Sequence, residues 1–203
     1  MGPAARQGDL FARHHADETP PTEHHRAQLP ELLTITAEQL QTWQSRIHGH
    51  QAPLLHGAQK HASQTALFSI NGPTASPPLN PLALKPLPLS FWRWPQSPHH
   101  GAAIYLVMDR PAHLSDPILL YVGETLAADR RWKGEHDCKA YLAAYGEALS
   151  TAGLASTPSI RFWTDVPSGT RERRRLEQHL IQTWLPPFNK ETRAHWATPF
   201  HAD

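Results

Sequence analysis

Proline places the strongest constraint on how this chain can fold. Eight of the 26 residues from Pro73 to Pro98 are proline. Because proline fixes φ and lacks a backbone N–H, this stretch cannot form a long helix or a central strand. Apolar side chains such as Leu87, Phe91 and Trp92 alternate with the prolines. A solvated linker has little use for them, so we expect residues 73–100 to be an extended connector that packs on a folded domain.

The composition changes at about Gly101. Residues 1–100 hold 13 of the 20 prolines and 10 of the 15 histidines, whereas all four tyrosines lie in residues 101–203. Residues 1–30 are polar and lack hydrophobic periodicity, which predicts a disordered tail. Residues 31–72 predict a short helical region. We therefore place a single domain at residues 101–203, after an irregular Pro- and His-rich N-terminal region.

The helix in the N-terminal region is predicted from its start signal. Thr36 and Gln39 have the spacing of a capping box. Leu40, Trp43 and Ile47 then recur at helical spacing, which predicts one amphipathic helix over about residues 37–48.

Cysteine content and charge exclude several classes of protein. The single cysteine, Cys138, excludes an internal disulfide framework and a Cys-rich zinc site, and it favours a reducing, cytoplasmic location. No apolar run approaches the ~20 residues that span a bilayer, so we expect no membrane partner. The first residues lack the apolar core of a signal peptide. A net charge of +1 gives no general attraction to nucleic acid, so such binding requires a local site.

The second half of the chain predicts an α+β unit. Residues 102–108 and 118–122 are short apolar runs separated by polar and proline residues, which is typical of an antiparallel hairpin. Residues 159–164 predict a third strand. Helices are predicted over residues 126–132, 137–150 and 170–184. We therefore expect a small antiparallel three-stranded sheet flanked by helices.

Several polar residues follow one another in an order that needs an explanation. Tyr105 and Tyr121 lie on consecutive predicted strands, and two arginines lie in the short helix that follows. Glu177 lies in the last predicted helix, and Asn189 follows that helix. Taken singly, each has an ordinary structural explanation, since a strand tyrosine usually packs its ring and a helix glutamate usually faces water.

Together these residues form an ordered pattern that resembles the GIY-YIG nuclease family. The two strand motifs are Ala103-Ile104-Tyr105 and Tyr121-Val122-Gly123. The arginine that follows the second motif matches Arg131. Within the family, the stretch around Glu177 and Asn189 most resembles the N-terminal nuclease domain of the bacterial excinuclease ABC. The resemblance covers about residues 101–190.

The resemblance implies a fold, a reaction and a role for each matched residue. It implies hydrolysis of phosphodiester bonds with Mg²⁺ or Mn²⁺ bound by Glu177, while Arg131 holds a phosphate oxygen. It assigns the Tyr105 hydroxyl to activating water as general base, which requires cations to lower a tyrosine pKa that is ordinarily ~10. Tyr121 would position water or phosphate, and Asn189 would orient the site.

Further residues are candidates by their position. Some family members carry a histidine after the arginine helix, and His136 lies near the equivalent place. Candidates for substrate binding are Gly123, Arg130, Lys133, Arg171 and Arg174. The arginine-rich start of helix 170–184 fits two interpretations, a solvated helix face or a patch that contacts phosphates without reading sequence.

The function expected from the sequence is that of a metal-dependent DNA endonuclease. Selectivity for damaged or branched DNA, and a role in DNA repair, are implied by the resemblance alone. Two alternatives stay open. One is a nuclease-like domain that binds nucleic acid or a partner without cutting, and the other is RNA as the substrate. Residues 1–100 would then cover the domain, bind a protein partner, or both.

Overall fold

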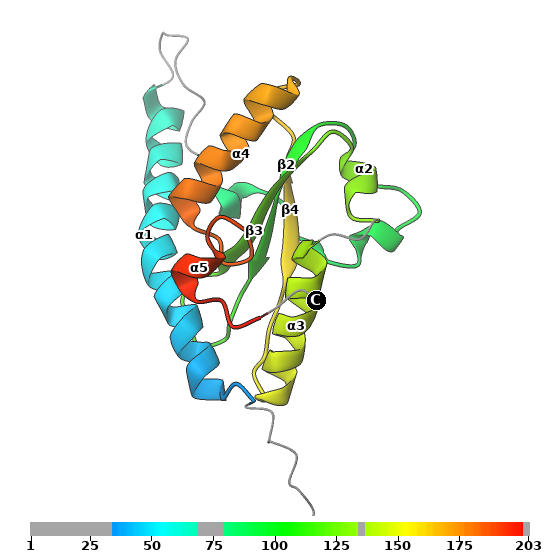
Figure 1. Ribbon diagram of the computed structural model, residues 1–203. Helices are drawn as coiled ribbons and strands as arrows, with labels where there is room; N and C mark the ends of the chain where they lie inside the picture. The colour runs from blue at the N-terminus through cyan, green and yellow to red at the C-terminus, as the bar shows by residue number, and fades with distance from the viewer. Residues whose placement is uncertain (1–33, 69–78, 134–136, 201–203) are drawn as a thin grey trace, which may run out of the picture. The chain divides into compact units, whose positions relative to one another are not determined.

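An antiparallel sheet is the central element of the protein (Figure 1). The computed structural model describes residues 34–68, 79–133 and 137–200. In this part of the chain the sheet has four strands, in the spatial order β1-β4-β2-β3. Their bounds are Leu87–Pro88 (β1), Ala103–Asp109 (β2), Ile118–Thr125 (β3) and Ser159–Trp163 (β4). With helices around this sheet, the fold class is α+β.

The prediction of three strands was wrong because the proline-rich segment supplies a fourth. Leu87 pairs with Ile160 and Pro88 with Ser159. Strand β1 lies at the edge of the sheet, the position that proline tolerates in a sheet because its missing N–H leaves no gap in an internal ladder. A strand of two residues has too few positions to show the alternation from which strands are predicted.

The rest of the proline-rich segment that the structure describes, residues 79–100, lies on the domain. Short 3₁₀ turns span Pro81–Ala83 (η1) and Phe91–Arg93 (η2). Leu87 and Phe91 are each only 2% exposed, and both belong to the core that covers Tyr105. Residues 73–78 of the predicted connector and the predicted tail 1–30 lie outside the described residues.

Strand β2 runs through the middle of the sheet and is buried on both faces. Ala103, Tyr105 and Val107 face a core built with α2 (Ala128–Arg131) and α3 (Asp137–Thr151). Ile104, Leu106 and Met108 face the opposite core, built with α4 (Thr170–Trp184). This alternation follows the two-residue period of a strand and brings α2 and α4 to opposite faces.

Helix α1 (Ala37–Phe68) is much longer than predicted. It begins at the predicted capping box, in which the Thr36 N–H donates to Gln39 Oε1 at 2.9 Å and the Gln39 N–H to Thr36 Oγ1 at 3.2 Å. Beyond the predicted end, Leu55 is fully buried beside α4 residues, a tertiary contact that local periodicity does not show. The compact unit spans Thr34–Asp203, so the domain begins earlier than the predicted residue 101.

The remaining helices follow the sequence closely, apart from the shortest. Helix α4 has the predicted bounds and ends at Leu185, whose φ of 47° precedes two prolines. Helix α2 is shorter than the predicted 126–132, and α5 (Arg193–Trp196) was not predicted. Four residues are too few to show helical periodicity. Among the described residues, no helix is both long enough and apolar enough to cross a membrane.

Candidate active site

The two motif tyrosines lie side by side on one face of the β2–β3 hairpin. Tyr105 pairs in register with Gly123, and Tyr121 pairs with Val107, two residues further along β2. The tyrosine rings are nearly parallel, with centroids 5.9 Å apart. Tyr105 is fully buried, whereas Tyr121 is only partly buried. Of the two hydroxyl groups, that of Tyr121 is therefore the more accessible to solvent.

Gly123 makes room for the Tyr105 ring. A Cβ atom built on Gly123 would lie 2.3 Å from Tyr105 Cζ and 2.4 Å from its hydroxyl oxygen. Any side chain at this position would displace the tyrosine. Gly123 was predicted to contact substrate, but its evident role is to let two strands bring Tyr105 against the backbone of β3.

Arg131 reaches the same place from α2. Its Nε donates a hydrogen bond to the Tyr105 hydroxyl at 3.2 Å, and its Cζ lies 5.9 Å from the Tyr105 ring centroid. The ring of Trp132 meets the same tyrosine edge-on at 5.9 Å. Arg131 is partly buried and so holds a positive charge beside both tyrosines.

The other basic candidates near α2 face the solvent. The side chain of Arg130 is 82% exposed and lies 3.5 Å from Asp129. Lys133 is also exposed. Neither contacts the tyrosines in the described structure. His136 lies outside the described residues, so its placement stays a prediction.

Burial raises the pKa values of both tyrosine hydroxyls. Burial raises the pKa of Tyr105 well above its ordinary value, with a further increase from Tyr121, while the Arg131 charge opposes the shift. The pKa of Tyr121 is also raised, chiefly by burial, with smaller increases from Cys138 and Glu177. Both hydroxyls are therefore protonated at neutral pH, and a role as base requires further positive charge.

Glu177 enters the site from α4, on the side of the hairpin opposite Arg131. Its Oε1 accepts a hydrogen bond of 2.9 Å from the backbone N–H of Glu124, the residue that follows Gly123. Burial raises the pKa of the Glu177 carboxyl group, and the neighbouring carboxylates of Glu124 and Glu191 raise it further. A carboxylate in these surroundings would gain from a cation, because the cation would neutralise charge that the protein leaves uncompensated.

Asn189 holds the backbone of β3. Its Nδ2 donates to the carbonyl of Val122 at 2.8 Å, and its Oδ1 accepts from the Val122 N–H at 2.9 Å. The side chain thus pairs with β3 as a neighbouring strand would. It fixes the residue between Tyr121 and Gly123, which is a positioning role of the kind expected from the sequence.

The arginines at the start of α4 do not all face the solvent. Arg173 is fully buried, with its Nε 2.9 Å from Glu124 Oε2 and its Nη1 donating to the carbonyls of Pro167 and Ser168. Arg174 lies 3.4 Å from Glu124 Oε1, and its side chain is 68% exposed. Arg171 and Arg175 are exposed.

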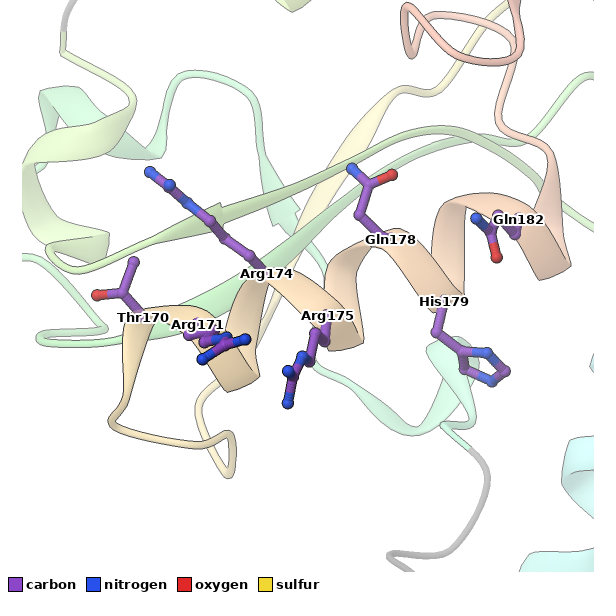
Figure 2. A pocket seen from close by; sticks show the side chains of 7 residues that line it. All are labelled: Thr170, Arg171, Arg174, Arg175, Gln178, His179 and Gln182. Carbon is purple, nitrogen blue, oxygen red and sulfur yellow. The ribbon is translucent and has the colours of Figure 1, made fainter.

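An open hollow of about 590 Å³ runs along the outer side of α4. Figure 2 shows that Arg171 and Arg175 extend to the same side of the helix, while Arg174 extends away from them. The hollow is lined by Thr170, Arg171, Arg174, Arg175, Gln178, His179 and Gln182. It therefore has a basic and polar lining at the end of α4 nearest the site.

Sequence reasoning missed Glu124 and the buried role of Arg173. Together they tie the turn after Gly123 to the first turn of α4, which places Glu177. The available signal was the i, i+4 spacing of Arg173 and Glu177, which puts both residues on the sheet-facing side of the helix.

The donor set suits a hard divalent cation bound mostly by water. In residues 34–68, 79–133 and 137–200 there is no group of three or more His, Cys, Asp or Glu side chains with the arrangement of a metal site. One carboxylate, with water and substrate oxygens completing the shell, is how Mg²⁺ is commonly bound. Comparison with protein-family models, with curated proteins and with solved structures finds no match to this chain.

Proposed function

We propose that this protein is a metal-dependent endonuclease that hydrolyses phosphodiester bonds in DNA. One observation carries the proposal. Arg131 and Glu177, from helices on opposite faces of the sheet, both bond to the Tyr105–Gly123 region of the β2–β3 hairpin. A cationic fork and a carboxylate beside two tyrosine hydroxyls are groups that phosphodiester hydrolysis uses.

A GIY-YIG-like fold is part of the same proposal. The hairpin carries the two tyrosine motifs, the arginine follows on a short helix, and the glutamate lies on the helix after the third strand of the predicted unit. This is the order in which the resemblance would place them. Strand β1 would be an addition contributed by the proline-rich segment.

Glu177 would hold the metal, with water and phosphate oxygens as the other ligands. Bound there, Mg²⁺ or Mn²⁺ would supply positive charge to the scissile phosphate and the leaving oxygen. Arg131 would bind a non-bridging phosphate oxygen through the guanidinium nitrogens that its bond to Tyr105 leaves free. Asn189 would keep β3 in register beside them.

The geometry favours different roles for the two tyrosines. Tyr105 is fully buried and accepts a hydrogen bond from Arg131, so it would hold that guanidinium in place. Tyr121 is partly exposed and would be the hydroxyl that contacts the attacking water or the phosphate. Accordingly, Tyr121→Phe should lower kcat with little effect on the free energy of unfolding, whereas Tyr105→Phe should also weaken Arg131-dependent substrate binding.

The exposed arginines of α4 would contact the DNA backbone. Arg171 and Arg175 are available for phosphate contacts, whereas Arg173 is fully buried and therefore unavailable. Such contacts position a duplex without reading its sequence. Replacing both Arg171 and Arg175 with alanine should weaken binding by a similar factor for every sequence and reduce its salt dependence.

The deciding experiment compares wild type, Glu177→Gln and Glu147→Gln on branched, nicked, damaged and plain DNA duplexes and on matched RNA. Glu147 is an exposed residue of α3 and serves as the matched control. We expect cleavage with Mg²⁺ or Mn²⁺ by wild type and Glu147→Gln, and none by Glu177→Gln or with EDTA. Cleavage that survives both EDTA and Glu177→Gln would refute the proposal.

A non-cleaving, nucleic-acid-binding domain is the second candidate. It is favoured by the structural bonds that Glu177 and Asn189 make to the backbone of β3, which account for both residues without catalysis. Salt-dependent binding of DNA, with no cleavage in any metal or on any substrate of the panel, would support this candidate over the first.

A further inference from the structure

The short segment Trp92-Arg93-Trp94 presents aromatic surface to the solvent. Trp94 is 45% exposed, and Leu126 is the other large hydrophobic side chain found exposed in the described part of the chain. Trp92, two residues earlier, is partly buried. Exposed tryptophan is a feature of binding surfaces, where a large rigid ring contributes contact area at a small entropic cost.

The segment is held in place by its neighbours. Phe91 is 2% exposed and packs edge-on against Phe162, with ring centroids 5.3 Å apart. Upstream, Leu87 is paired with Ile160 in the sheet, and Pro95 follows Trp94 directly. A segment fixed in this way loses little conformational freedom when it binds a ligand.

Two cations lie beside the aromatic rings. Arg93 Cζ is 5.0 Å from the centroid of the Trp92 ring, and Nζ of Lys139, from α3, is 5.7 Å from it. Arg93 is exposed. Aromatic faces accompanied by cations are how proteins bind single-stranded nucleic acid, since bases stack on the rings and phosphates meet the charges.

The segment lies on the Tyr105 face of the sheet. Trp92 packs against the core cluster that contains Tyr105 and Trp132. The chain then runs to Gly101, whose carbonyl accepts a hydrogen bond of 2.9 Å from the N–H of Ala128 at the start of α2. The aromatic surface therefore belongs to the side of the molecule on which α2 presents Arg131.

We propose that Trp92, Arg93 and Trp94, with Lys139, form a stacking platform for unpaired bases of the substrate. An unpaired base stacks on Trp94 while Arg93 and Lys139 contact the adjoining phosphates. Bases inside a duplex cannot stack in this way, so the platform selects DNA that has a single-stranded portion. This inference deepens the proposed function and rests on it for the identity of the substrate.

The test measures binding apart from cleavage. The full-length Glu177→Gln protein is titrated in EDTA, at two salt concentrations, into a fluorescein-labelled 12-nucleotide oligothymidine and into a labelled 12-base-pair duplex. Fluorescence anisotropy reports both affinities. Adding Trp94→Ala should weaken binding of the single strand about 5- to 150-fold, the range expected for one stacked base, and leave duplex binding within about twofold.

Further variants separate stacking from other effects. Trp94→Phe should retain part of the single-strand affinity, and Arg93→Ala should reduce both the affinity and its salt dependence. Leu126→Ala is the matched control, since it removes the other exposed hydrophobic side chain and should change neither affinity. Thermal unfolding of each variant checks that the fold is retained.

Two outcomes would overturn the platform. One is single-strand affinity that is unchanged in both Trp94→Ala and Arg93→Ala, which would leave the exposed rings to a protein partner. The other is an equal loss of single-strand and duplex affinity in Trp94→Ala. A failed nuclease would give a different result, since single-strand binding would still depend on Trp94 while no metal supported cleavage.

Discussion

Gly123 is the residue at which the hairpin tolerates no side chain. Gly123→Ala places a methyl group 2.3 Å from Tyr105 Cζ, so the ring or the strand must move. We expect a loss of about 1–3 kcal/mol in the free energy of unfolding, the usual cost of overpacking a core. Denaturant titration measures this loss, and any cleavage activity should fall with it because Tyr105 positions Arg131.

Gly146 provides the matched control. It lies on an exposed position of α3, and an added Cβ would meet nothing within 4 Å. Gly146→Ala should raise stability by about 0.5–1 kcal/mol, because alanine is the better helix former. Equal effects of the two substitutions would show that the Tyr105 ring can yield to a methyl group.

Glu177 is expected to lower stability in the absence of metal. Its pKa is raised above the ordinary 4.5, chiefly by burial, so the ionised carboxylate disfavours folding. Glu177→Gln should therefore be more stable than wild type above the raised pKa of the folded state. This gain should disappear as the pH falls through that pKa towards and below the ordinary carboxyl pKa, because the carboxyl group is then neutral in both states.

The measurement is thermal unfolding of both proteins from pH 3 to pH 8, in EDTA and in Mg²⁺. If Glu177 binds the metal, Mg²⁺ should stabilise wild type and leave Glu177→Gln unchanged, since a ligand stabilises only the state that binds it. A stability difference that does not vary with pH would contradict the assigned cause.

The site residues show what a sequence can and cannot predict at this scale. Tyr105, Arg131 and Glu177 were predicted from their order along the chain, and the structure brings them to one hairpin. The difference between Arg173 and Arg174 was not predictable. Both lie in one run of arginines, and only the packing of α4 on the sheet buries the first and exposes the second.

Among the elements, strand β3 has an unusual set of hydrogen-bond partners on its outer side. Gln51 of α1 accepts from the Leu119 N–H at 2.7 Å and donates to the Leu119 carbonyl at 3.0 Å. Asn189 does the same for Val122, and Glu177 accepts from the N–H of Glu124. Side chains from separate parts of the chain thus take the place of a further strand.

Gln51 should therefore contribute strongly to stability. Gln51→Ala leaves buried polar groups of Leu119 without partners, and each such group costs about 1–3 kcal/mol, so we expect a total loss of about 2–4 kcal/mol. The control is Gln178→Ala on α4, whose hydrogen bond to Glu191 is exposed and whose loss should change stability by less than about 0.5 kcal/mol. Urea titration of both variants decides between these values.

The elements themselves differ in how far sequence reveals them. Helix α4 was predicted in full because it has both helical periodicity and two prolines after its end. The second half of α1 was not, because it contains Gly49 and Pro53 and is held by Leu55 and Gln51, whose partners lie far away in the chain. Long-range contacts of this kind leave no local pattern.

For the whole molecule, the position of α1 changes where the domain begins. Residues Leu40, Trp43, Ile47 and Leu55 are buried in the cores that also cover the sheet. The split in composition at Gly101 therefore does not mark a boundary of folding. Composition distinguishes kinds of residue, whereas a domain is defined by which side chains pack together.

Truncation tests this boundary. A chain that begins at Thr34 should unfold cooperatively at a temperature close to that of the full chain. A chain that begins at Ala58 should not fold, because each of the four buried α1 side chains is worth about 1.5–3 kcal/mol and a domain has only about 5–15 kcal/mol in total. Near-ultraviolet circular dichroism and thermal melts report both results, and a folded chain starting at Ala58 would contradict them.

The two borders of the sheet have a consequence for how the protein meets other chains. At one border, Pro88 has no N–H to offer, and β1 is only two residues long. At the other, the polar side chains bonded to β3 already occupy backbone groups that an incoming strand would need. A peptide or a second copy would find little room to extend this sheet, which guards against fibril growth and domain swapping through strand addition. Any partner must instead recognise side chains on the outer surface.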